Sequence, residues 1–261
     1  MKPDTAAHVA LRTQLSELIS ESGLSEVRAG IEALVKPAIG LRTRAATDED
    51  RVVGATRVGG EPDLPSSLAW PVGKEGPLLF VMQVALADVT ALDLESLLPS
   101  DGQLLLFSDR FVDEPRVLYL PPQALVRRAA SESFTECGVD IVAELHLPQD
   151  FSDFVGSARD GQPPAQLRLS DVDYDAYCEK LRQPWHARMR PGCSGQDAVH
   201  QLLGYTTCQD STQQRAGDDV LFAFDTDDQA GMEWGDAQCV FTLLPRQALL
   251  ERTFTPLRAV I

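Results

Sequence analysis

The chain has 261 residues, 44% of them hydrophobic and 24% charged, so it can bury a substantial core and is too apolar for extended disorder. Its 39 Asp and Glu residues against 23 Lys and Arg residues give a formal net charge of −16. Such an excess of carboxylates repels phosphate groups. It argues against nucleic acid and anionic membranes as partners, and it would attract a basic protein or a cation. The alternative, which we favour for the charge taken alone, is that the acidic surface only keeps the protein soluble.

Cysteine usage and the N-terminal segment predict a reduced, cytoplasmic protein. The five cysteines are Cys137, Cys178, Cys193, Cys208 and Cys239. Their odd number and the absence of a Cys-x-x-Cys pair argue against a disulfide framework and a zinc ribbon. Residues 1–20 lack the continuous apolar run of a secretory signal, and no run reaches the roughly 18 apolar residues of a membrane helix.

Residues 4–36 are predicted to form a helical hairpin. Apolar side chains recur at helical spacing in both arms: Leu11, Leu15, Leu18 and Ile19, then Val27, Ile31, Leu34 and Val35. Ser22-Gly23 supplies the break between the helices, and Pro37 ends the second one. We expect residues 1–45 to form this hairpin segment and to pack on the body of the protein.

From Ile39 onward the pattern changes to that of β-strands. Strands are predicted at residues 39–44, 51–58, 78–84, 103–108, 116–120, 133–144, 220–224 and 238–244, and short helices at 88–98, 170–183 and 246–251. A loop rich in Gly and Pro is predicted at 156–166. Antiparallel strands with short helices between them, and no β-α-β alternation, predict the α+β class.

Two stretches of the chain share one sequence pattern. The first contains Gly59-Gly60-Glu61-Pro62, Trp70-Pro71, Leu78-Leu79-Phe80 and Gly102-Gln103-Leu104-Leu105-Leu106-Phe107. The second contains His200-Gln201-Leu202-Leu203-Gly204-Tyr205, Val220-Leu221-Phe222 and Trp234-Gly235-Asp236-Ala237-Gln238-Cys239-Val240-Phe241. We interpret them as an internal duplication. One β-rich copy spans residues 46–155 and the other 156–261, packed as one compact unit with a cleft where they meet.

The duplication predicts particular positions in the fold. Strands 78–84 and 220–224 should be equivalent and buried, so that Leu79→Ala and Leu221→Ala each cost about 2–5 kcal/mol. Trp70 and Trp234 should occupy related positions. Glycines stand at the turns before the strands of each copy, where positive φ or close backbone approach is needed: Gly60, Gly102, Gly204 and Gly235.

These motifs, in this order, resemble the YwqG-like family of bacterial proteins, which has no established biochemical role. The motifs are Gly59-Gly60-x-Pro62-x-Leu64-Pro65, Trp70-Pro71, Pro77-Leu78-Leu79-Phe80 with Gln83, Pro99-x-x-Gly102-x-Leu104, His200-Gln201-x-x-Gly204-Tyr205, Gln209, Asp225-x-Asp227 and Trp234-Gly235-Asp236. The resemblance covers residues 50–261. The chain departs from the family at Leu203, where a second Gly is common, and at Thr206, where Pro is common.

Templates for nucleotide binding and hydrolysis are missing from the sequence. Gly-x-Gly-x-x-Gly, Walker and His-Glu-x-x-His motifs are absent, and Gly192-Cys193-Ser194-Gly195 lacks the last Gly of a nucleophile elbow. Cys193, His200 and Cys208, with Asp210, could hold zinc or form a Cys/His nucleophile pair, although the spacing matches no common zinc motif. Unpaired buried cysteines are a simpler interpretation.

The acidic segment 225–236 has two interpretations. Asp225, Asp227 and Asp236 stand near the ligand positions of a calcium loop, but Ala230 replaces its Gly. The alternative, which we favour, is a hairpin turn in which Asp side chains accept backbone N–H groups and Gly231 and Gly235 are left-handed. We therefore expect no cofactor, with calcium as the alternative, and expect replacement of Asp227 to cost little unless the loop binds metal.

Six residues are candidates for a binding site: Trp70, Gln83, His200, Gln209, Trp234 and Asp236. The indoles can line an apolar pocket beside a constrained turn, and a buried Gln must find hydrogen-bond partners. The basic residues Lys180, Arg182, Arg188 and Arg190 are interpreted as a solvated helix end.

Two functions follow from these observations. The first is a non-enzymatic binding or protein-interaction module, in one form an immunity-type protein that covers a basic effector with its acidic surface. The alternative is a small-molecule or metal-dependent enzyme whose site lies between the copies and uses His200, Asp225, Asp227 and Asp236. We favour the binding module, because no catalytic template is present and the charge is strongly acidic.

Overall fold

The computed structural model describes residues 2–148, 175–190, 200–206, 217–235, 239–255 and 257–260. In this part of the chain a ten-stranded, antiparallel sheet is accompanied by two small two-stranded sheets and a few short helices, which confirms the α+β class. The predicted loop at 156–166 and the start of the predicted helix at 170–183 lie outside the described residues. The internal duplication and the boundaries of its copies stay predictions.

The elements follow one another along the chain in the order in which they are numbered. The helical elements are α1 (Ala6–Glu21), η1 (Ser25–Val27), α2 (Arg28–Leu34), α3 (Leu86–Val89), the π-helical η3 (Ala176–Arg182), α5 (Gln183–Met189) and α6 (Arg246–Leu250). The strands are β1 (Lys36–Ala45), β2 (Arg57–Val58), β3 (Asp63–Leu64), β4 (Val72–Gly73), β5 (Gly76–Pro77), β6 (Leu79–Ala85), β7 (Gln103–Ser108), β8 (Arg116–Leu120), β9 (Val126–Arg127), β10 (Cys137–His146), β11 (His200–Leu203), β12 (Asp218–Asp225), β13 (Cys239–Pro245) and β14 (Arg258–Val260).

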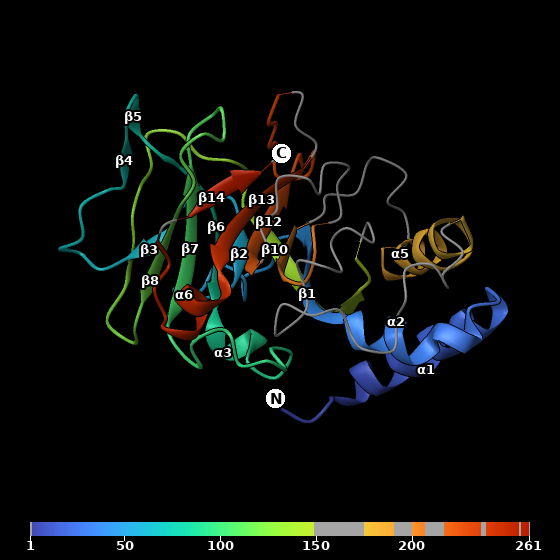
Figure 1. Cartoon of the computed structure of the whole chain (residues 1–261). Coiled ribbons are helices and arrows are strands. Elements are labelled where there is room, and N and C mark those ends of the chain that lie inside the picture. Colours follow the sequence, from blue (N-terminus) through green and yellow to red (C-terminus); the bar gives the residue numbers. More distant parts are fainter. Residues whose placement is uncertain are drawn as a thin grey trace.

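Strands β1 and β10 form the centre of the large sheet. They pair over ten residues, from Lys36 opposite His146 to Ala45 opposite Cys137. The sheet order is β14-β13-β12-β11-β1-β10-β2-β6-β7-β8, so the strands before β10 lie on one side and those after it on the other, with β1 joining the two. Figure 1 shows helices α1, α2 and α5 together at one end of the molecule, away from β3, β4 and β5.

The outer hairpins of the two sides have matching irregularities. The β6–β7 register shifts between Phe80 and Met82, and the β12–β13 register shifts between Val220 and Phe222. Each shift inserts one extra residue, which bends a strand and increases its twist. The shared bulge fits the predicted duplication, which it does not by itself establish.

The main core lies between the two sides of the large sheet. Its cluster joins Leu104 and Leu106 of β7 with Val240 and Leu244 of β13. The rings of Tyr119 in β8 and Phe254 just before β14 are 6.0 Å apart, so the two edges of the sheet approach each other. The sheet therefore curls around one shared apolar interior. Smaller clusters cover the opposite faces of the β6–β8 and β12–β13 regions.

The N-terminal helical hairpin forms as predicted and packs on the body. Thr5 caps α1 by accepting a hydrogen bond from the His8 N–H at 3.4 Å. Apolar residues of α1 and α2 share a core with η3, α5 and the end of β10. In that core the Trp185 indole N–H donates to the Leu145 carbonyl at 2.6 Å. Burial and this hydrogen bond together attach α5 to the sheet.

Backbone conformation confirms the expectation for the four turn glycines. Gly60, Gly102, Gly204 and Gly235 all have positive φ. A Cβ on Gly102 would lie 2.3 Å from the Leu120 carbonyl oxygen, so the close approach also requires glycine there. Leu203, where the resembled family often has Gly, has φ of 61° and is buried. Burial of the Leu203 side chain therefore offsets the energetic cost of the left-handed backbone conformation.

Several predicted elements differ from those observed. The strand predicted at 51–58 is reduced to β2, because residues 48–54 form turns. The helix predicted at 88–98 is only α3, after which Asp93 accepts hydrogen bonds from the Leu97 and Leu98 N–H groups. These side-chain bonds offer the backbone an alternative to a helix. In the described residues no helix combines the length and apolar character needed to cross a membrane.

The two leucines chosen as equivalent core positions differ in burial. Leu221 is 0% exposed, whereas Leu79, at the start of β6, is half-buried. The prediction of a buried strand is confirmed for β12 and for Phe80–Val84, but it is wrong for Leu79. Its neighbour Leu78, 2% exposed, is in the buried position instead.

Leu221→Ala and Leu79→Ala provide a matched test of this difference. We expect Leu221→Ala to lower the free energy of unfolding by about 3–5 kcal/mol, because it leaves a cavity in the main core. Leu79→Ala should lower it by only about 1–2 kcal/mol. Urea denaturation of both variants beside the parent measures the two losses, and equal losses would contradict the assignment.

Candidate functional site

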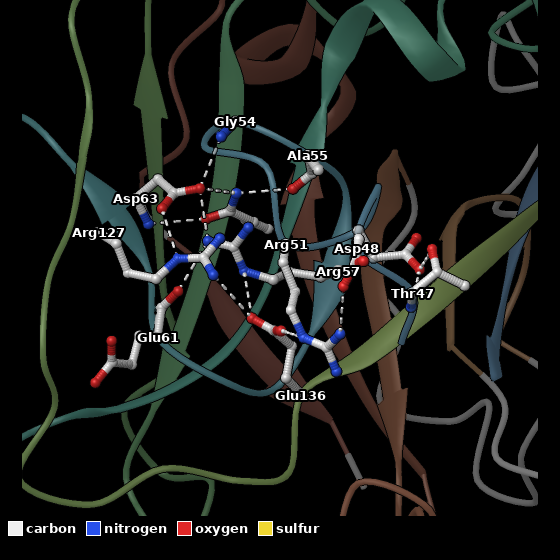
Figure 2. Close-up of polar contacts among 12 residues, drawn as sticks. Thr47, Asp48, Arg51, Gly54, Ala55, Arg57, Glu61, Asp63, Arg127 and Glu136 are labelled. Carbon is white, nitrogen blue, oxygen red and sulfur yellow. Dashed lines mark hydrogen bonds and ion pairs between the residues drawn. The ribbon is translucent and has the colours of Figure 1, made fainter. Parts of the chain in front are cut away.

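The most concentrated set of buried polar groups surrounds the carboxylate of Asp63 (Figure 2). Arg57 Nη2 lies 2.6 Å from Asp63 Oδ2, and both side chains are almost completely buried, at 0% and 1% exposure. Arg127 Nε contacts Asp63 Oδ1 at 3.2 Å, and the Gly54 N–H donates to Oδ2 at 2.7 Å. The carboxylate therefore joins β2, β3, β9 and the turn at residue 54.

Gln83, a predicted binding residue, belongs to this network and is completely buried. Its Oε1 accepts the Asp63 N–H at 2.9 Å, and its Nε2 donates to the Ala55 carbonyl at 2.8 Å and to Asp63 Oδ2 at 2.9 Å. All three contacts go to neighbouring chain segments. In this conformation Gln83 connects β6 to the 54–63 region, and its own buried amide group is hydrogen-bonded.

A second carboxylate, Glu136, closes the network at its outer side. Its Oε2 lies 3.2 Å from Arg127 Nη1 and 3.7 Å from Arg57 Nε, and its Oε1 lies 3.3 Å from Arg51 Nε. Its side chain is 18% exposed. Two carboxylates and three guanidinium groups thus alternate from Asp63 outward, an arrangement that compensates the charge of the buried Arg57.

The ionisation of the central pair follows from these contacts. Burial alone would raise the pKa of Asp63, but the Gly54 hydrogen bond and the Arg57 charge hold it below its ordinary value. Burial lowers the pKa of Arg57. A guanidinium titrates so far above neutrality that Arg57 still carries its charge, so the two groups form a true ion pair.

His200 and Asp227, two further predicted site residues, are in contact and buried. His200 Nε2 lies 3.1 Å from Asp227 Oδ2, and His200 Nδ1 accepts the Asp225 N–H at 3.3 Å. Because Nδ1 is an acceptor, the proton lies on Nε2 and is donated to Asp227. His200 therefore ties β11 to the turn that follows β12.

The turn itself has the geometry of the hairpin interpretation. Asp227 Oδ1 accepts the Gln229 and Ala230 N–H groups at 2.8 and 3.2 Å, and Gly231 and Gly235 have φ of 64° and 63°. Burial would raise the pKa of Asp227, but the hydrogen bonds from His200 and its other neighbours keep it low. These contacts predict that replacing Asp227 lowers stability more than the sequence indicated, because its carboxylate organises the turn.

The two tryptophans do not occupy related positions, contrary to the expectation. The Trp70 indole N–H donates to the Leu78 carbonyl at 2.9 Å, just before β6 begins. The Trp234 indole N–H donates to the Asp225 carbonyl at 3.0 Å, where β12 ends. Trp70 therefore lies at the start of β6, whereas Trp234 lies at the end of β12. Trp234 is almost completely buried, whereas Trp70 is half-buried.

Some of the predicted site residues cannot be placed. Gln209, Asp236, Cys193, Cys208 and Asp210 lie outside the described residues. Within the described ranges no group of three His, Cys, Asp or Glu side chains is arranged to hold a metal. Calcium binding by Asp225, Asp227 and Asp236 stays a prediction.

A second buried polar cluster, missed from the sequence, lies at the end of β10. Glu144 Oε2 lies 2.8 Å from His146 Nε2 and 3.3 Å from Arg190 Nη2, and Arg190 also donates to Gln201 Oε1. The Tyr205 N–H donates to His146 Nδ1 at 3.4 Å. The cluster thus joins β10, β11 and the end of α5.

Two glycines make room for this cluster. A Cβ on Gly40 would lie 2.4 Å from Glu144 Oε1, and a Cβ on Gly204 would lie 2.6 Å from His146 Nδ1. The signal in the sequence was the i, i+2 spacing of Glu144 and His146, which places them on one face of a strand. The interpretation of Arg190 as part of a solvated helix end is wrong, because its side chain is only 10% exposed.

Burial and charge act oppositely on the titrating groups of this cluster. Burial opposes ionisation of Glu144, but the His146 hydrogen bond and the Arg190 charge lower its pKa to about 2. Burial lowers the pKa of His146, and it lowers that of His186 further. The His186 ring lies 5.8 Å from that of His146, and its buried Nε2 has no hydrogen-bond partner among the described residues. Both histidines are therefore neutral near pH 7.

The model of a protein family described as a domain of unknown function, DUF1963, matches residues 56–260. The match begins next to Arg57 and includes Asp63, Gln83 and Glu136 of the first cluster and Glu144, His146 and Arg190 of the second. A search of curated proteins finds no match.

Asp63→Asn tests the central ion pair. Removing the carboxylate charge leaves Arg57 buried without its partner, so we expect the free energy of unfolding to fall by about 3–5 kcal/mol. The matched control is Asp48→Asn, which weakens an exposed ion pair with Arg51 and should change stability by less than about 0.5 kcal/mol. Similar losses for both variants in urea denaturation would contradict a stabilising role for Asp63.

Stability should decrease with acidification through the histidines of the second cluster. Their pKa values in the folded protein lie below the ordinary 6.5. Below pH 6.5 the unfolded chain therefore binds more protons, and the free energy of unfolding falls as the pH decreases. We expect a loss of up to about 1.4 kcal/mol per pH unit for each histidine between pH 6.5 and 5. Urea denaturation at several pH values in this range measures how the free energy of unfolding changes with pH. We expect this pH dependence to be weaker in His186→Asn than in the parent protein, and an unchanged pH dependence would refute the assignment.

Proposed function

We propose that this chain, which belongs to the DUF1963 family of domains of unknown function, is a non-enzymatic binding module for a basic region of another protein. The observation that carries the proposal is where the charges lie. Among exposed side chains of the described residues, Asp and Glu outnumber Lys and Arg. An acidic surface attracts a basic partner and speeds the encounter.

Internal ion pairs leave this acidic excess in place. Arg57 and Arg190 are held by buried carboxylates. Lys36 and Arg246 both contact Asp219, at 2.8 Å each, and the Asp219 side chain is 7% exposed. Among the described residues more carboxylates than basic side chains are buried, yet exposed carboxylates still outnumber exposed basic groups. The field outside the protein is therefore acidic.

The buried polar clusters support a binding scaffold as well. Around Asp63, hydrogen bonds connect strands and turns that are far apart in the sequence. Around Glu144, they attach α5 and β11 to the centre of the sheet. Networks of this kind give a rigid framework, and a rigid framework lowers the entropic cost of binding a partner.

Three narrower statements belong to the same proposal. Membership of a YwqG-like group rests on the motifs of the two halves. A cytoplasmic location rests on the odd cysteine count and the absence of a Cys-x-x-Cys pair. An immunity-type role, in which the acidic surface covers a basic effector protein, rests on charge complementarity.

The alternative is a small-molecule or metal-dependent enzyme, favoured by the contact between His200 and Asp227. Both side chains are buried, at 2% and 3% exposure, so a substrate could reach neither in this conformation. A binding surface has no such requirement, and the exposed carboxylates are directly available to a partner. The binding function is therefore the one that we propose.

Identification and reconstitution of the partner test the function. Partners captured by crosslinking in the native cell are identified, purified and titrated against the protein by calorimetry at low and at high salt. We expect a basic partner whose affinity falls at least about tenfold between the two conditions, because salt screens exposed charges. An unrelated protein of similar size and net charge is the control. The proposal fails if no purified candidate binds, if salt has no effect, or if the control binds equally well.

A further inference from the structure

A groove of about 290 Å³ lies between the β4–β5 ribbon and the loop that joins β7 to β8. Residues 73–79 line one side, and the other side consists of Glu132 and most of residues 109–114. The floor is apolar: Leu78 is buried and Leu79 is half-buried. Its size is at the lower end for small ligand pockets, which suits one large side chain better than a cofactor.

An exposed aromatic ring stands at this groove. Phe111 lines it and is 66% exposed, which is unusual for a phenylalanine. Its neighbour Val112 is only 3% exposed and belongs to the main core. Because the Val112 side chain packs in the core, the side chain of its neighbour Phe111 is exposed to solvent.

The loop is held in this conformation by the side chain of Asp109. Its Oδ2 accepts the Phe111 N–H at 3.2 Å, and its Oδ1 accepts the Glu114 N–H at 2.7 Å. Val112 has φ of 56°, in the left-handed region that β-branched residues strongly disfavour. Such strain persists only where surrounding contacts determine the conformation, so Phe111 is presented in a fixed place.

In the described part of the chain, both basic side chains that line the groove form ion pairs, whereas two of its carboxylates form neither an ion pair nor a hydrogen bond. Lys74 is engaged by Glu114, which accepts its backbone N–H at 2.6 Å and lies 3.3 Å from its Nζ. Arg110 forms an ion pair with Glu132. Glu75 and Asp113 are exposed and make no ion pair or hydrogen bond within the described residues. Two uncompensated carboxylates and one aromatic ring therefore line the same groove.

We propose that this groove binds an arginine side chain from an extended, basic segment of the partner protein, an inference that rests on the proposed function. The planar guanidinium stacks on the ring of Phe111, and its N–H groups donate to the carboxylates of Glu75 and Asp113. The aliphatic part of the side chain covers Leu79. The fixed loop reduces the ordering needed on binding.

Fluorescence anisotropy with a labelled peptide of twelve alternating alanine and arginine residues tests the groove. We expect the full-length protein to bind this probe at low salt. Phe111→Ala and the double variant Glu75→Gln/Asp113→Asn should each bind it at least about fivefold more weakly. The controls are Leu250→Ala, another exposed apolar side chain, and Glu49→Gln/Asp101→Asn, which changes the net charge by the same amount elsewhere. The controls should bind within about twofold of the parent.

The outcomes separate this inference from the function on which it rests. Equal weakening in the control charge variant would mean general electrostatic attraction and would overturn the groove assignment. Equal affinity for a matching alanine and lysine peptide would overturn recognition of arginine. No binding of the probe to the parent protein would also overturn the inference, while the binding function is judged separately by reconstitution with its own partner.

Discussion

The pairing of β1 with β10 is the contact on which the rest of the architecture depends. It joins a strand from the first 45 residues to one from the middle of the chain over ten residues, and every other strand of the large sheet lies outside it on one side or the other. Pairing between segments so distant in sequence is stabilised only when both sides add their own strands and cores. Gly40 and Gly204 show how closely the centre is packed, because a methyl group at either position would collide with the Glu144 and His146 side chains.

One buried charge cluster lies beside this central pair, and a second includes residues of β10 itself. Asp63 contacts Arg57, Arg127 and the turn at Gly54 beside the pair. Glu144, in β10, contacts His146 and Arg190. In each, one carboxylate receives donors from several segments. Its removal would leave a buried cation without compensation, so the clusters make these connections specific as well as stable. That is a sufficient physical reason for the concentration of polar residues there, without any catalytic task.

Function is better sought on the surface than in these clusters. Ion pairs inside the protein hold basic groups away from solvent, while exposed carboxylates remain in excess. The groove beside Phe111 adds local structure to this general field. Val112, in a strained backbone conformation, packs in the main core, and its neighbour Phe111 therefore remains exposed. Phe111 lines the groove together with the carboxylates of Glu75 and Asp113, which are unpaired within the described residues. In the function that we propose, a general acidic field would attract many basic proteins, whereas the groove would select among them.

The sequence by itself determined the local features: the N-terminal helical hairpin, the buried runs of β6 and β12, and the turn glycines with positive φ. Each depends on periodicity or on backbone conformation, which neighbouring residues specify. Tertiary structure alone decided that Leu78 rather than Leu79 is buried, and that Trp70 and Trp234 lie at opposite ends of their strands. It also brought Arg127 to Asp63 across 64 positions of the sequence, and Arg190 to Glu144 across 46. Such contacts depend on the order and register of the strands, which cannot be inferred from the spacing of residues in a single sequence.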